Sequence, residues 1–352
     1  MNLNLRRQLN PKCMNQNFKW AIVPLILFGC QEFEVVTPEA VDKTTQKTAS
    51  NSNADQTTNA ASATRKVYYL AGYPGNLFRI NADGTGDTQL TTDGKNGNLD
   101  VSADGSKIVF ANSAKNNWNI YIADLTSNGI TNKRTLYGGR YRDEDCKFSP
   151  DGRKVVFKTN QFAAAQYGNN RAYDICLIDV ATGVVTKLTN NSNAEAWAPC
   201  FSPDGSKIAF VLRANSQGPE GDEIYLINTD GSNLKRITNN SYADWYPTFS
   251  ANGNLIFASQ PVASCDDDLY QIPASALSTS NPGSQATVIP VSACSLISDA
   301  DPYSSKINED DLAFVSTRSG PYGIYIGNKS TGAVSTVISK SGIDLLGPTL
   351  VE

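Results

Sequence analysis

Acidic and aromatic residues stand side by side at recurring positions in this sequence. Stretches such as "RYRDED", "NAEAWAP" and "YADWYP" place carboxylates next to tyrosine or tryptophan. Carboxylates attract a cationic segment or a metal ion, and aromatic rings combine contact area with a polar handle. The mixture indicates a binding surface. Its candidate residues are Asp143, Glu144, Asp145, Glu195, Trp197, Asp244, Trp245, Tyr246, Asp299 and Asp301.

The sequence contains no histidine, which excludes every catalytic or metal site that needs an imidazole. A Ser-His-Asp triad, a Cys-His pair and imidazole-based zinc sites are excluded, and no C-x-x-C pair offers thiolates instead. Ser-Lys chemistry and paired-carboxylate hydrolysis stay open, but no acid pair stands out from the others. The net charge of −4 gives no electrostatic argument for nucleic-acid binding. We therefore expect a binding protein that is not an enzyme and has no cofactor.

The candidate residues fall between copies of one hairpin, which appears as "DVSADGSKIVF", "KFSPDGRKVVF", "CFSPDGSKIAF" and "TFSANGNLIF". Each copy reads as a short strand, a tight turn and an apolar strand. An aromatic residue in the apolar strand marks six units with spacings of 41, 47, 53, 47 and 57 residues. A third and a fourth strand are expected to follow in each unit. The markers are Tyr69, Phe110, Phe157, Phe210, Phe257 and Phe314.

A period of about 40–50 residues with four strands per unit is typical of a β-propeller. The folded body begins at "KVYY", a second strand without a first, and the chain ends in "GPTLVE", which matches the first strand "YPTFSA". Residues 348–352 are therefore expected to supply the innermost strand of the first blade and close the ring. The sequence predicts an all-β, six-bladed propeller over residues 65–352.

The repeats resemble the TolB-like family of propellers, whose WD40-like (PD40) repeats carry S-P-D-G. The resemblance covers residues 65–352 and implies the propeller fold and a place in the cell envelope. It also implies that turns between first and second strands fall on Asp104-Gly105, Asp151-Gly152, Asp204-Gly205 and Asn252-Gly253. Tol–Pal members of this family carry an α/β domain before the propeller, whereas in this chain we expect the tether over residues 31–64 in its place. Related oligogalacturonate lyases hold a metal with histidines, which this chain lacks.

The N-terminal residues have the features of a targeting signal. Lys19 precedes the apolar run from Ala21 to Phe28, which is too short for a transmembrane helix and suits a signal peptide over residues 1–29. The run ends in Leu-Phe-Gly-Cys, which looks like a bacterial lipobox with Cys30 as the lipidated residue. An ordinary signal peptide is the alternative. The residue after the cysteine is Gln31 rather than Asp, which resembles the pattern of outer-membrane lipoproteins. Residues 30–64 are rich in Thr, Asn, Ala and Ser, and we expect them to form a flexible tether.

The cysteines of an exported protein can form disulfides. Cys265 and Cys294 lie in two loops of blade five that should share a face, so we expect them to pair. A bond between Cys146 and Cys200, on neighbouring innermost strands, is a weaker alternative. Cys176 takes the position of a tyrosine in other blades and is expected to be buried.

The loop after the second strand and the loop to the next blade should share one face of a propeller. We therefore expect the candidate residues to form an acidic, aromatic rim at the channel mouth, where residues 266–268 could add a calcium site. The alternative is that the acids cap turns and the aromatics pack between blades. We expect the rim to dock an envelope protein; a glycan or cell-wall ligand, or carbohydrate-active enzyme chemistry on two carboxylates, are the other hypotheses.

Overall fold

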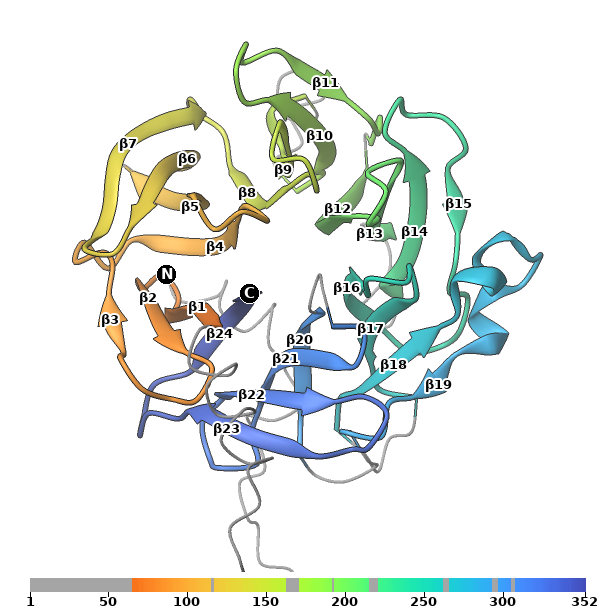
Figure 1. Ribbon diagram of the computed structural model, residues 1–352. Coiled ribbons are helices and arrows are strands. Elements are labelled where there is room, and N and C mark those ends of the chain that lie inside the picture. The colour runs from red at the N-terminus through yellow and green to blue at the C-terminus, as the bar shows by residue number, and fades with distance from the viewer. Residues whose placement is uncertain are drawn as a thin grey trace, which may run out of the picture. The chain divides into compact units, whose positions relative to one another are not determined.

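Six four-stranded antiparallel sheets are arranged as blades around one axis (Figure 1). This arrangement confirms the predicted all-β, six-bladed propeller. The signal peptide, Cys30 and the tether of the sequence prediction lie outside the described residues. The computed structural model describes residues 65–114, 117–162, 171–191, 193–214, 221–261, 266–292, 297–304 and 308–352.

Each blade contains four strands, which are named in order from the innermost to the outermost. Blade 1 consists of β24 (Leu345–Val351), β1 (Lys66–Ala71), β2 (Asn76–Asn81) and β3 (Thr88–Gln89), and blade 2 of β4 (Asn96–Val101), β5 (Lys107–Ala114), β6 (Asn117–Thr126) and β7 (Gly129–Tyr137). Blade 3 consists of β8 (Asp143–Phe148), β9 (Lys154–Thr159), β10 (Asp174–Asp179) and β11 (Val185–Lys187), and blade 4 of β12 (Ala194–Phe201), β13 (Lys207–Ala214), β14 (Glu223–Asn228) and β15 (Lys235–Arg236). Blade 5 consists of β16 (Asp244–Phe249), β17 (Leu255–Ser259), β18 (Asp268–Ile272) and β19 (Thr287–Val288), and blade 6 of β20 (Asp299–Ser304), β21 (Asp311–Ser316), β22 (Gly323–Asn328) and β23 (Val334–Ile338).

The C-terminal strand closes the ring. β24 pairs antiparallel with β1, and Val67 lies opposite Leu350 in the register. The Arg65 guanidinium also reaches the Asp311 carboxylate of blade 6 at 2.7 Å. The predicted closure is confirmed, although the strand begins at Leu345 rather than at Pro348. Because β24 completes blade 1, the open edge of a linear array is removed.

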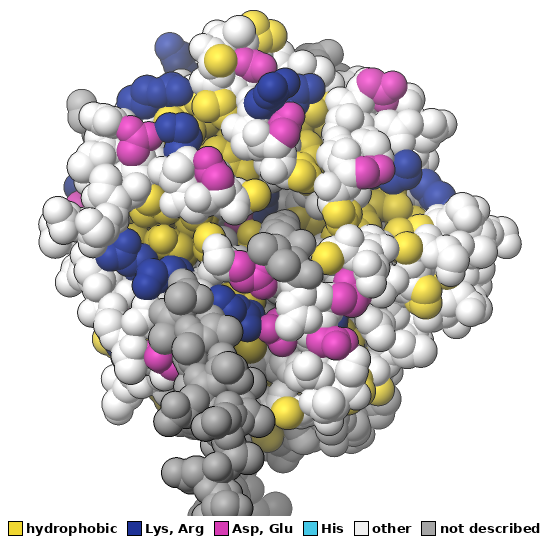
Figure 2. All heavy atoms as spheres, viewed as in Figure 1, with side chains coloured by type: hydrophobic (Ala, Val, Ile, Leu, Met, Phe, Trp, Pro, Cys, Tyr) yellow, Lys and Arg dark blue, Asp and Glu magenta, His cyan; other side chains and the backbone are white. Residues whose placement is uncertain are grey.

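The hydrophobic core of the described residues is divided into six clusters, each between two neighbouring blades. Yellow side chains lie in the hollows between blades in Figure 2. All six marker aromatics are buried in the second strands, and in five blades the marker packs on an aromatic of the third strand. In blade 3, Cys176 stands opposite Phe157, and the Tyr137 ring of blade 2 lies 4.9 Å from the Phe157 ring. The predicted burial of Cys176 is confirmed.

The repeated hairpin turns are built as predicted. In blade 2 the Ser102 hydroxyl donates to the Asp104 carboxylate at 2.6 Å, and the Ser106 amide donates to the same oxygen at 3.0 Å. Gly105 has a φ of 69°, a left-handed conformation that glycine adopts without steric cost. These Asp-Gly turns mark one face of the propeller, which we call the turn face.

The connection between β18 and β19 is the exception among the links between third and fourth strands. It contains the 3-10 helices η4 (Ala274–Ser278) and η5 (Pro282–Gln285), and it projects at the right of Figure 1. No helix in the described part of the chain is long and apolar enough to cross a membrane.

Candidate binding site where the innermost strands begin

The predicted binding residues lie on the innermost strands β8, β12, β16 and β20, whereas the sequence placed them in the loops between blades. These strands begin early because the preceding blade supplies hydrogen bonds. The Asp244 amide donates to the Asp222 carbonyl at 3.0 Å, and the Asp299 amide donates to the Asp267 carbonyl at 2.8 Å. Such links connect neighbouring blades and bring the strand starts to one face, which we call the start face.

Three of the candidate acids occupy the same repeat position and are buried. Asp143, Asp244 and Asp299 are 1%, 0% and 2% exposed. The hydroxyl of Ser259 donates to Asp244 at 2.5 Å, and the side-chain amide of Asn240 donates at 2.8 Å. Burial raises the pKa of Asp143 to about 7 and that of Asp244 to about 6. These acids join strands within and between blades.

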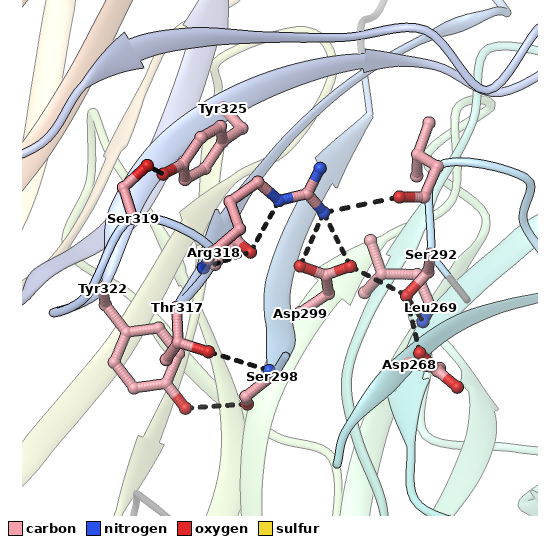
Figure 3. A network of polar contacts seen from close by, with 12 residues as sticks. Asp268, Leu269, Ser292, Ser298, Asp299, Thr317, Arg318, Ser319, Tyr322 and Tyr325 are labelled. Atoms are coloured by element: carbon pink, nitrogen blue, oxygen red, sulfur yellow. Dashed lines mark hydrogen bonds and ion pairs between the residues drawn. The ribbon is translucent and has the colours of Figure 1, made fainter. Parts of the chain in front are cut away.

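Asp299 belongs to a polar network at the seam between blades 5 and 6 (Figure 3). One guanidinium nitrogen of Arg318 lies 2.9 Å from both Asp299 carboxylate oxygens. The Ser292 hydroxyl bridges Asp299 at 2.9 Å and Asp268 at 3.0 Å. The charge of Asp299 is therefore compensated by a cation of its own blade.

The candidates Asp145, Tyr246 and Asp301 sit at β-bulges of the innermost strands. Their φ angles are 57°, 50° and 48°, so the backbone turns left-handed and re-aims each side chain. The Asp145 carboxylate accepts the Ala198 amide of the next blade at 3.0 Å, and Asp301 accepts the Gly347 amide at 2.7 Å. Each of these two acids thus connects its blade to the following one.

A buried lysine compensates the acids of blade 3. The Lys158 ammonium is 3.0 Å from Asp145 and 3.7 Å from Glu144, and Lys158 is only 4% exposed. Glu144 also accepts from the Arg142 guanidinium at 2.9 Å and from the Tyr73 hydroxyl at 3.2 Å. The sequence did not indicate this pairing, because Lys158 lies on a different strand from both acids.

A second compensated cluster joins blades 4 and 5. Arg213 contacts Glu195 at 2.7 Å and Asp222 at 3.1 Å, and the Trp245 indole donates to Asp222 at 3.1 Å. Burial raises the pKa of Asp222 to about 6, although Arg213 opposes the rise. Sequence reasoning missed both Arg213 and Asp222. The sequence signal that could have revealed them is their position: Arg213 lies near the end of the second strand β13, and Asp222 lies just before the third strand β14.

The accessible part of the start face is smaller than the predicted rim. The side chain of Glu195 is 29% exposed, and Trp245, Tyr246 and Asp301 are half-buried. Trp197 is buried and meets Tyr246 edge to face at 5.3 Å between ring centres. Trp197 and Trp245 occupy equivalent register positions beside the bulges of β12 and β16. The face therefore offers acidic and aromatic groups on rigid strands.

Blade 5 holds acids that no cation of the described residues neutralises. Asp244, Asp267 and Asp268 form no ion pair within that part of the chain. The Ser298 hydroxyl donates to Asp267 at 3.2 Å, and burial raises the pKa of Asp267 to about 7. No group of three or more Cys, Asp or Glu residues in the described ranges is arranged to hold a metal ion.

Only some of the cysteines lie within the described residues. Cys265 and Cys294, the predicted disulfide, lie outside the described residues. Among the described residues, Cys146, Cys176 and Cys200 form no disulfide, so the alternative bond between Cys146 and Cys200 is absent. Burial raises the pKa of the Cys146 and Cys176 thiols, which keeps both in the unreactive protonated form.

The described chain is a six-bladed propeller with a polar start face, and comparisons place it beside TolB-like propellers. No family model matches it. It is 30% identical over 126 residues, 36% of this chain, to an uncharacterized protein of Agrobacterium fabrum, and 35% identical over 113 residues, 32% of this chain, to the Tol-Pal system protein TolB of Francisella tularensis. These matches span only 37% and 23% of the two proteins.

A solved structure supports the same assignment of fold. The crystal structure of TolB from Acinetobacter baumannii superposes with a TM-score of 0.63 and 18% identity, covering 82% of this chain and 66% of that chain. The fold and the relatives together confirm the predicted resemblance to TolB-like propellers.

Proposed function

We propose that this protein is a non-enzymatic binding module of the bacterial cell envelope that docks a protein partner on its start face. The observation that carries the proposal is the partly exposed group of Glu195, Trp245 and Tyr246 on rigid innermost strands. Aromatic anchors beside acids suit a partner that presents apolar and basic residues. The partial similarity to the Tol-Pal system protein TolB supports an envelope protein as that partner.

Affinity capture from envelope extract tests this proposal. The bait is the full chain, compared with a Glu195→Gln, Asp301→Asn double variant that removes two charges but keeps the hydrogen-bond acceptors. The matched control is Asp83→Asn with Asp230→Asn, two exposed acids in turns outside the start face. We expect a protein that wild type and control retain and the double variant loses. Equal capture by all three proteins, or none by any, would contradict the proposal.

Two other functions are outcomes of the same experiment. The half-buried Trp245 favours glycan binding as the second candidate, because an aromatic ring on a rigid strand can stack on a sugar. Retention of cell-wall glycan without a protein, lost on Trp245→Ala, would establish it. Turnover of a glycan that a single carboxylate substitution abolishes would instead show a carbohydrate-active enzyme.

We also propose that a lipid on Cys30 anchors the protein to the outer membrane, on its periplasmic or its surface side. The support is the Leu-Phe-Gly-Cys sequence and Gln31 after it. Mass spectrometry of the N-terminal peptide should show an acylated Cys30, and Cys30→Ala should release the protein to the soluble fraction. An unmodified Cys30 in membrane-bound protein would overturn the anchor and leave the partner proposal untouched.

A further inference from the structure

The long connection of blade 5 creates a groove at the seam with blade 4. Residues 273–286 link β18 to β19, whereas residues 229–234 suffice between β14 and β15 of blade 4. The Lys235 ammonium ties the two blades, because it donates to the Leu277 and Thr279 carbonyls at 2.8 and 2.6 Å. A cavity of about 710 Å³ lies at this seam, on the turn face, and we call it the blade 4–5 groove.

The groove has an apolar floor and a polar rim. Leu226, Phe249 and Leu277 supply the floor, and all three belong to the cluster that joins blades 4 and 5. The groove is also lined by the exposed Asp204 carboxylate and by Lys235, and its rim carries side-chain amides and hydroxyls together with one exposed lysine. These rim residues are Ser206, Lys207, Asn228, Asn233, Asn252 and Ser278.

Lys207 lacks an acid on the facing strand, unlike the equivalent lysines of blades 2 and 3, whose register partners are aspartates; the equivalent Lys66 of blade 1 likewise faces an asparagine, Asn81. In blade 2 the equivalent Lys107 faces Asp124 in the register and pairs with it at 2.6 Å. In blade 4 the residue opposite Lys207 is Asn228, and Lys207 forms no ion pair with the described residues. An exposed ammonium therefore stands at the rim of an apolar groove without a matching carboxylate.

The nearby Asp204 does not take that role. Its carboxylate already accepts the Ser202 hydroxyl at 2.6 Å and the Ser206 amide at 3.0 Å, which build the hairpin turn. These hydrogen bonds, with the charge of Lys207 as a smaller cause, lower the pKa of Asp204 to about 2. The groove thus favours a ligand that brings its own carboxylate.

We propose that the blade 4–5 groove binds an extended peptide segment of a partner protein, with an acidic side chain beside an apolar one. The acid pairs with Lys207, and the apolar side chain covers Leu226 and Phe249. The side-chain amides of Asn233 and Asn252 can each donate to and accept from a peptide backbone, whereas an acyl chain would bury them unpaired. The groove lies on the turn face, so this site is separate from the start face.

A peptide array tests the proposal with the full-length protein. The probes are capped pentapeptides with apolar residues at the second and fourth positions and Asp, Glu, Asn, Gln or Lys at the centre. We expect the acidic peptides to be retained over their amide twins. Lys207→Gln should weaken the best acidic peptide by about tenfold or more, the effect of losing a charged hydrogen bond. Lys107→Gln, the equivalent change in blade 2, should leave binding unchanged.

Two further variants keep the outcome decisive. Asn228→Asp restores the acid that blade 2 has, so it should neutralise Lys207 and weaken the acidic peptides as Lys207→Gln does. Ala274→Trp fills the groove and should abolish binding of every peptide while the protein still unfolds at the wild-type temperature. Equal retention of acidic and amide peptides, or binding of decanoate without binding of any peptide, would overturn the proposal.

Discussion

At the start face, paired acids of blades 3 and 4 share a cation, whereas Asp244, Asp267 and Asp268 of blade 5 form no ion pair among the described residues, and neither does Asp143 of blade 3. Glu144 and Asp145 share the buried Lys158, and Glu195 and Asp222 share Arg213. Asp244, Asp267 and Asp268 of blade 5 accept hydrogen bonds from hydroxyl and amide groups instead. The number of acids in a stretch of sequence therefore does not predict its uncompensated negative charge, because cations on distant strands pair with some acids and not with others.

The largest effect should come from the buried cation of blade 3. Lys158→Met removes the partner of two buried carboxylates, and breaking such a pair typically costs about 3–5 kcal/mol. Denaturant unfolding should show this loss. Lys154→Met, at an exposed position of the same strand, is the matched control and should leave the midpoint almost unchanged. A similar midpoint for both variants would show that the compensation in blade 3 is unimportant for stability.

A smaller difference should separate two acids at equivalent positions. Asp299→Asn leaves the Arg318 guanidinium without its carboxylate and should cost about 1.5–3 kcal/mol, the range for charged hydrogen bonds. Asp244 pairs with no cation among the described residues, so Asp244→Asn leaves none unpaired. The side-chain oxygen of the new asparagine can still accept the hydrogen bond from Ser259. Unfolding of the two variants side by side at pH 5 tests the comparison. An equal or larger loss in Asp244→Asn would contradict it.

The uncompensated acids should also make stability depend on pH. The pKa values of Asp143 and Asp267 rise to about 7 and that of Asp244 to about 6 in the folded chain, above the value of 3.8 for a free side chain. The folded protein then binds more protons than the unfolded one between about pH 4 and 7. The free energy of unfolding should fall as the pH rises through this window.

Unfolding midpoints between pH 5 and 8 measure this slope. Asp244→Asn should flatten it, because one titrating group is removed. Asp230→Asn, at an exposed turn of blade 4, should leave it unchanged. If the stability of the wild-type protein instead increased from pH 5 to 8, these buried acids could not be the cause of its pH dependence.

The smallest effect on stability should come from Glu195, the partly exposed acid of blade 4. The Glu195 side chain is 29% exposed, so its pair with Arg213 is screened by water and Glu195→Gln should cost less than about 1 kcal/mol. The same substitution should still weaken partner binding. A large loss of stability would mean that Glu195 is structural and would remove it from the binding surface.

The periodic features could be predicted from the sequence, and the pairing across blades could not. The hairpin turn at Ser202 and Asp204 uses neighbouring residues, and the closure by β24 follows from a missing strand, so local patterns suffice for both. The burial of Asp244 depends on a hydrogen bond from its amide to the Asp222 carbonyl of another blade. The partners of Asp145 and Asp222 likewise lie on other strands, out of reach of a local pattern.

Photo-crosslinking in living cells tests the central claim most directly. Tyr242 is half-buried and lies just before β16 on the start face, so p-benzoylphenylalanine at this position conserves an aromatic ring there. The account predicts a crosslinked envelope protein from this position and none from the same group at Asp83 in a turn of blade 1. A crosslink from Asp83 alone, or identical products from both positions, would contradict docking on the start face.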